Sequence, residues 1–272
     1  MQTILSATFP TADEASADDG RRSVMQGYGL AMVPDLIFDV GMHRGEDTLF
    51  YLEKGYRVVA IDANPVLCRQ ARQRFSNYIS SGRLFIVEAG LSDSHGTMNF
   101  YRCIDKDDWS SFDPVYGTRD PNHEVIKVPT LPLEHLLGVF GTPYYIKIDV
   151  EGFDDQCIQA LERWRDPPRY VSVESTVRNF ATRMQALGYS KFKIISQVLH
   201  NTVPQRVPSL EGLSVEKVFT GHQSGPFGED TYGRWMDAEE FETERGSLNP
   251  EMRSQSVHAK EYGATEAQLA ES

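Results

Sequence analysis

The sequence has 272 residues, of which 40% are hydrophobic, so it can form one large domain or two small ones around a sizeable core. Its formal net charge of -12 disfavours nucleic acid and anionic membrane surfaces as partners, because both require a basic face. No apolar run approaches the roughly 18 residues that span a membrane, and the N-terminus lacks the basic start of a secretory signal. We therefore expect a soluble, cytoplasmic protein without membrane insertion.

Strands and helices are predicted to alternate along the central part of the chain. Apolar runs that end in turn residues predict strands at 36–41, 56–62, 83–90, 96–103, 124–130, 144–152, 169–175, 192–197 and 215–221. Apolar residues at helical spacing predict helices at 46–55, 65–80, 131–141, 153–165 and 177–188, with a short one near 23–30. This alternation predicts an α/β fold with a doubly wound, mostly parallel sheet.

Composition divides the chain into four segments. Residues 1–30 form a leader without periodicity that we expect to be flexible, and residues 31–221 form the α/β domain. Residues 222–246 carry Phe227, Tyr232 and Trp235 among glycines, which could cover a substrate or simply pack as a surface loop. Residues 247–272 form a polar, acidic tail that we expect to be disordered. Half of the net charge lies from residue 237 onward, where nine acidic residues face three basic ones.

A glycine turn follows the first predicted strand, in the stretch FDVGMHRGEDT at 38–48. Gly41 and Gly45 let the backbone approach a ligand closely, and the helix start after them offers free N–H groups. The middle glycine of the dinucleotide fingerprint is missing, which disfavours a pyrophosphate cradle. The same glycines could equally serve tight packing alone.

Asp62 ends the second predicted strand, 23 residues after Asp39, and Asn64 follows it. A carboxylate in this position can accept both hydroxyls of a ribose. Together with the glycine turn, Asp62 indicates a ligand with a ribose and a small charged group, such as S-adenosylmethionine (SAM). Asp39 could bind the ammonium group of that ligand, although both aspartates could also be simple helix caps.

Several stretches in this order resemble the FkbM-type SAM-dependent methyltransferases, over about residues 35–180. They are FDVGMHRGEDT, VVAIDANP, VEAGLSDSHGTMNFY, VPTLPLEHLL, YYIKIDVEGFDDQCIQAL and RYVSVE. The residues FDD after Gly152 and the absence of an Asp in LPLEHLL depart from the family's usual pattern.

The resemblance implies a class I (Rossmann-like) methyltransferase fold with a seven-stranded sheet and helices on both faces. It implies SAM as the cofactor and transfer of a methyl group to a hydroxyl of a small molecule or glycan, such as a sugar or polyketide. The candidate cofactor contacts are Asp39, Gly41, Gly45, Thr48, Asp62, Asn64, Glu88, Leu91 and Ser92.

The row KIDVEG provides the candidate catalytic residues. Lys147, Asp149 and Glu151 have a spacing of two, so they would share one face of a strand end. A carboxylate there could take the proton of an acceptor hydroxyl, and we expect Asp149 to lie nearest the reacting centre. A structural row of salt bridges is the alternative. A divalent metal ion could also assist in place of a base, but no histidine has a suitable spacing, so no metal ligand is assigned.

The long segment 104–124 combines turn residues with Trp109, Phe112 and Tyr116, which is typical of a functional loop. It is therefore a second candidate for the wall that selects the acceptor. Two other functions fit parts of the pattern. One is a SAM-binding module without catalysis, and the other is an NAD(P)-dependent oxidoreductase. The sequence does not indicate the oligomeric state.

Overall fold

The structure is a computed structural model that describes residues 32–174, 177–196, 202–219, 223–247 and 259–262. The predicted leader 1–30 and most of the predicted tail 247–272 lie outside these residues. Within the described ranges, no helix combines the length and the apolar composition needed to cross a membrane.

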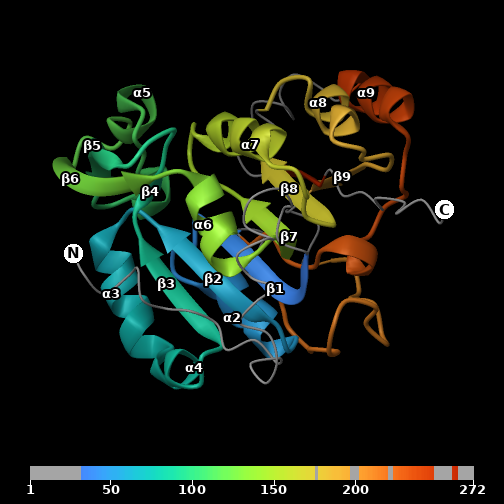
Figure 1. The fold of residues 1–272 in the computed structure, drawn as a ribbon, viewed down its shortest axis with the longest axis horizontal. Helices are drawn as coiled ribbons and strands as arrows, with labels where there is room; N and C mark the ends of the chain where they lie inside the picture. Colours follow the sequence, from blue (N-terminus) through green and yellow to red (C-terminus); the bar gives the residue numbers. More distant parts are fainter. Residues whose placement is uncertain (1–31, 175–176, 197–201, 220–222, 248–258, 263–272) are drawn as a thin grey trace, which may run out of the picture.

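A mostly parallel sheet forms the centre of the molecule (Figure 1). Its parallel strands occur in the order β3 (Leu84–Glu88), β2 (Arg57–Asp62), β1 (Val33–Val40), β7 (Pro143–Ile148) and β8 (Tyr170–Glu174). Beyond β8, the antiparallel strands β10 (Ala259–Tyr262) and β9 (Lys193–Ser196) extend the sheet. The predicted α/β class with a mostly parallel sheet is confirmed. The order reverses between β1 and β7, which is where open α/β sheets bind ligands.

A smaller sheet contains the two strands predicted at 96–103 and 124–130. It has the order β4 (Gly90–Leu91), β6 (His123–Leu131) and β5 (Gly96–Cys103), with β5 and β6 antiparallel. Figure 1 shows this sheet, in green, to one side of the main sheet and far from α8 and α9. The segment between β5 and β6 carries the short helices η1 (Asp107–Trp109) and α5 (Pro114–Gly117).

The helices agree with the predictions in place but differ in their ends, except for the last one, which was not predicted. They are α2 (Glu46–Glu53), α3 (Pro65–Arg74), α4 (Ser76–Ser80), α6 (Leu133–Phe140), α7 (Asp154–Arg163), α8 (Phe180–Ala186) and α9 (Ala238–Ser247). The helix predicted at 65–80 is interrupted at Phe75, whose ring packs against Gly45. The strand predicted at 215–221 is wrong, because residues 215–219 have no regular structure.

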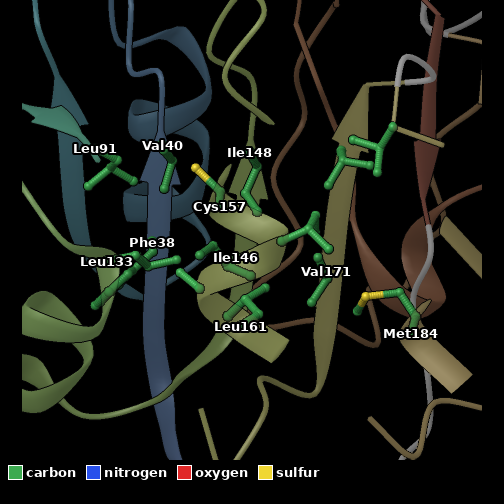
Figure 2. Close-up of a cluster of buried hydrophobic side chains, with 14 of the residues drawn as sticks. Phe38, Val40, Leu91, Leu133, Ile146, Ile148, Cys157, Leu161, Val171 and Met184 are labelled. Carbon is green, nitrogen blue, oxygen red and sulfur yellow. The ribbon is translucent and has the colours of Figure 1, made fainter. Parts of the chain in front are cut away.

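Two hydrophobic clusters lie on opposite faces of the main sheet, because successive strand residues point to opposite sides. In β1, Phe38 and Val40 belong to one cluster and Ile37 to the other. Helices α6, α7, α8 and α9 contribute to the cluster of Phe38, part of which Figure 2 shows. Helices α2 and α3 contribute to the second cluster, together with Phe219 and Phe227 from the late part of the chain.

Candidate functional site

A cavity of about 410 Å³ lies at the carboxyl ends of β1, β2 and β7, where the strand order reverses. Its size is within the range of small-molecule and cofactor sites. Its walls come from the glycine turn, the end of β2, strand β4, the turn after β7 and the segment 107–112.

The two glycines of the first turn have different roles. Gly41 lines the cavity at a φ of 82°, and a Cβ there would lie 1.8 Å from the carbonyl oxygen of Asp149. Gly41 is therefore required for the ends of β1 and β7 to meet. Gly45, at a φ of 77°, lies outside the cavity wall, and a Cβ there would lie 2.5 Å from the Phe75 ring. For Gly45, the structure agrees with the alternative of tight packing.

A network of buried polar side chains lies directly behind the cavity wall. Asp39 is fully buried, accepts a hydrogen bond of 2.5 Å from the Thr48 hydroxyl, and lies 3.2 Å from the Lys147 ammonium. Lys147 Nζ also donates to the carbonyl oxygen of Gly41 at 2.7 Å. Burial lowers the pKa of Lys147, but the charges of Asp39, Asp149 and Asp47 outweigh it and raise the pKa overall. Asp39 and Thr48 thus lie behind the wall and not in it.

Asp62 reaches the cavity at the end of β2. Its two carboxylate oxygens accept the backbone N–H groups of His43 and Asn64, each at 2.7 Å. Burial raises the pKa of Asp62 to about 6, although these two hydrogen bonds oppose the shift. Each carboxylate oxygen can accept a further bond, so the carboxylate can still receive ligand hydroxyls. Asn64 also lines the cavity, and its side chain caps α3 by accepting the N–H of Val66 at 3.0 Å.

Three predicted contacts come from β3 and the residues after it. Leu91 lines the cavity, next to Gly90. Glu88 and Ser92 are absent from the wall: the Glu88 carboxylate pairs with Arg72 at 2.5 Å, and the Ser92 hydroxyl donates to the carbonyl oxygen of Ser94 at 2.7 Å. The acidic residue at the strand end therefore lines the cavity at β2 but not at β3.

All three candidate catalytic residues line the cavity. Strand β7 ends at Ile148, so Asp149 and Glu151 lie in the turn that follows it. The prediction that they share one face of a strand end is therefore wrong. Asp149 lies 3.6 Å from the Lys147 ammonium. Glu151 accepts a hydrogen bond of 3.0 Å from Arg119. Burial, and next the charge of Asp149, raise the pKa of Glu151 to about 7, with Arg119 opposing the shift.

The segment 107–112 forms one wall of the cavity. Asp107 joins it to the glycine turn, because its carboxylate lies 3.0 Å from His43 Nε2 and 2.9 Å from Arg44. The sequence interpretation identified the long segment but assigned no role to Asp107. The only available signal was the length of that segment.

An aromatic wall complements these charges. The rings of Phe100 and Phe112 lie 5.0 Å apart, those of Phe112 and Phe153 lie 5.3 Å apart, and all three line the cavity. Trp109 and Tyr116, which were predicted to form the wall with Phe112, are absent from it.

The late segment differs from the prediction of an aromatic cover. Phe227 is fully buried in the second hydrophobic cluster, and its ring stacks on Tyr145 at 4.3 Å. Trp235 stacks on Tyr170 at 6.4 Å. Of the described residues after 202, only Gln223 lines the cavity. The Asp47 carboxylate accepts the N–H groups of Ser224 at 2.9 Å and Gly225 at 3.1 Å, which holds the two residues after Gln223 in place.

An open, mostly parallel α/β sheet with a cofactor-sized cavity at its order reversal defines a class of small-molecule enzymes and binding proteins. Within that class, the model of the methyltransferase FkbM domain matches residues 39–201, more than half of the chain. The chain belongs to the FkbM methyltransferase family.

Two further comparisons concern individual proteins. Among solved structures, the precorrin-6y C5,15-methyltransferase from Geobacter metallireducens GS-15 is 13% identical, with a TM-score of 0.35, over 69% of this chain and 81% of that one. No curated protein matches the sequence.

Proposed function

We propose that the protein is a SAM-dependent methyltransferase that methylates a hydroxyl group of a small molecule or glycan. The observation that supports this function most strongly is the meeting of Asp62 and Glu151 in one cavity of an FkbM-family chain. One carboxylate is suited to bind a ribose and the other to accept a proton.

The chemistry of the cavity wall fits SAM, which carries a sulfonium and an ammonium group. Carboxylates outnumber cationic side chains in the wall, where Glu46, Asp47, Asp62, Asp107, Asp108, Asp149 and Glu151 face Arg44 and Lys147. Asp62 would accept the ribose hydroxyls, and Leu91 with Gly90 would contact the base. Because the charge of Asp39 is already met by Lys147 beneath the wall, the lining carboxylates are better placed to face the positive charges of the ligand.

When bound, SAM supplies a methyl group activated by its sulfonium, so the protein must align the acceptor and remove its proton. Glu151 is the better candidate base, because a group with a pKa near the working pH transfers protons most effectively and its pKa is about 7. Asp149, 3.6 Å from the Lys147 ammonium, would orient the acceptor hydroxyl. The rings of Phe112 and Phe153 would exclude water from the reacting groups.

The direct test is incubation with SAM labelled in its methyl group and a panel of hydroxylated acceptors, including monosaccharides, glycosides and hydroxylated polyketides. We expect label in at least one acceptor, and a loss of about 100-fold or more in Glu151→Gln, the lower end for removal of a general base. Label transferred equally well by the variant would exclude Glu151 as the base.

The same purified protein also distinguishes the two alternative functions, a SAM-binding module without catalysis and an NAD(P)-dependent oxidoreductase. A non-catalytic module would bind S-adenosylhomocysteine and transfer no label to any acceptor. An oxidoreductase would change the fluorescence of added NADH, which we do not expect because the glycine turn lacks the middle glycine.

A further inference from the structure

Arg119 is held in a fixed position beside the cavity. Its guanidinium lies between two rings, 5.0 Å from the centre of Trp109 and 4.8 Å from the centre of Tyr116, and its Nε donates to the carbonyl oxygen of Tyr116 at 3.0 Å. One Nη donates to Glu151 Oε2 at 3.0 Å. Stacking and hydrogen bonding thus fix the plane of the guanidinium, which is what directional binding of a carboxylate requires.

The backbone around Arg119 is anchored as well. The next residue, Asp120, is buried, and its carboxylate accepts the N–H groups of Asp105 at 3.0 Å, Lys106 at 3.1 Å and Asn122 at 2.9 Å. On the other side of the same segment, the Ser111 hydroxyl donates to the carbonyl oxygen of Glu151 at 2.5 Å. The segment between β5 and β6 therefore holds both the main chain and the side chain of Glu151.

We propose that Arg119 is a positioning residue, which holds the Glu151 carboxylate in the cavity wall and keeps it available as a proton acceptor. This inference rests on the proposed function. It gives the Trp109 and Tyr116 rings a role that the sequence did not indicate, because they support Arg119 and do not contact the acceptor.

The charges around Glu151 show why it needs a cation. Burial raises its pKa most, and Asp149 on the same turn and Asp154 at the start of α7 raise it further. The Lys147 ammonium is directed to Asp39, Asp149 and the Gly41 carbonyl oxygen. Among the residues that the structure describes, Arg119 is the cation that bonds Glu151 directly, and its loss would raise the pKa of this carboxyl further.

The test is a titration of the Glu151 carboxyl carbon by NMR in the full chain, with its signal assigned from Glu151→Gln. We expect Arg119→Gln to raise the Glu151 pKa by about one unit or more, the usual effect of losing an adjacent opposite charge. Arg119→Lys keeps the charge without the planar fork, so we expect a smaller rise. Arg102→Gln is the matched control, since Arg102 bonds Glu124 on the same small sheet at 2.7 Å, and it should leave the Glu151 titration unchanged.

A Glu151 pKa that stays the same in Arg119→Gln, or that moves equally in Arg102→Gln, would overturn the proposal. Should Arg119→Gln fail to fold, the contact can be followed from its other side. Slowly exchanging Nη–H signals of Arg119 are then expected in the wild-type protein and absent in Glu151→Gln, and their persistence in that variant would equally contradict the inference.

The titration requires no acceptor, so its outcome is independent of the proposed function. A chain that transfers no methyl group to any acceptor would end the methyltransferase proposal while the pKa is still measured. Once an acceptor is found, the acid limb of kcat/KM against pH should move upward in Arg119→Gln by the same amount as the Glu151 pKa. A profile that does not move would show that Arg119 has only a structural role.

Discussion

Two irregular segments of this chain contain similar kinds of residue but place their aromatic rings in different surroundings. Residues 104–124 and 223–235 both combine aromatic residues with turn formers, and both were candidates for a wall over the acceptor. The first supplies Asp107, Asp108, Ser110, Ser111 and Phe112 to the cavity. The second buries Phe227 completely among Tyr51, Tyr56, Tyr144, Tyr145 and Tyr170.

The difference follows from the edge of the sheet that each segment reaches. Segment 104–124 leaves from β5 and crosses the carboxyl ends of the parallel strands, where ligands bind. In segment 223–235, Gln223 lines the cavity, but Phe227 packs on Tyr56, Tyr144 and Tyr170, which stand at the beginnings of β2, β7 and β8. An aromatic loop at the amino ends therefore completes the core, and one at the carboxyl ends forms a site.

The largest expected effect is on stability, when one aromatic ring is removed from each segment in turn. Phe227→Ala should lower the free energy of unfolding by about 3–5 kcal/mol, because it empties a fully buried site, and Phe112→Ala should lower it much less, since Phe112 is half-buried at the cavity. Denaturant unfolding measures both. Binding of S-adenosylhomocysteine should weaken only in Phe112→Ala. Equal destabilisation by the two variants would contradict the comparison.

A buried ion pair gives the next effect. Lys54 Nζ lies 2.8 Å from Asp230, and both side chains are almost completely buried. Lys54→Met leaves a buried carboxylate unpaired, so we expect a loss of about 3 kcal/mol. The double variant with Asp230→Asn should recover part of that loss. A double variant that is destabilised by the sum of the two single effects would show that the residues are not coupled.

The third effect concerns the cavity itself, where ligand binding should depend on pH. The Asp62 pKa is about 6, and its ionised form is the better acceptor for hydroxyls. The dissociation constant of S-adenosylhomocysteine should therefore rise as the pH falls through 6, by up to about tenfold per unit. Calorimetry in the wild-type protein and in Asp62→Ala measures it. Any dependence that remains in the variant belongs to other groups, such as Glu151, and an identical dependence would contradict the role of Asp62.

The smallest effect concerns the ion pairs that join segment 104–124 to the glycine turn. Asp107→Asn should cost less than about 1 kcal/mol of stability, because these pairs are partly exposed. Bound S-adenosylhomocysteine should nevertheless dissociate faster, since Asp107 closes the cavity against His43 and Arg44. Stopped-flow displacement measures this rate. The matched control is Asp35→Asn, which removes an exposed pair with Arg57 at the other end of β1.

The sequence was sufficient for the features that depend on local pattern. Apolar runs and helical spacing located the central strands and helices, and the end of β2 identified Asp62 as a residue that reaches the cavity. The break at Phe75 was not predictable, because it depends on the contact of that ring with Gly45 across a distance of thirty residues.

The parts of the site that the sequence missed depend on long-range pairing. Asp107 and Arg119 are ordinary charged residues of a loop until β5 and β6 bring that loop to the cavity. In the same way, Asp39 and Thr48 were assigned to the ligand from their place in the glycine turn. Their side chains instead bond each other beneath the wall, and the Lys147 charge comes from a strand about a hundred residues later.

The central claim is that the cavity holds SAM with its ribose on Asp62, and a titration of S-adenosylhomocysteine into wild-type protein and Asp62→Ala tests it most directly. Two hydrogen bonds to a charged group contribute together about 3 kcal/mol, so we expect binding to the wild type and a dissociation constant at least about 100-fold higher in the variant. Asp62 also holds the N–H groups of His43 and Asn64, so a ligand analogue without ribose hydroxyls should discriminate between the two proteins much less. Absence of binding to the wild type, or equal binding to both proteins, would contradict the claim.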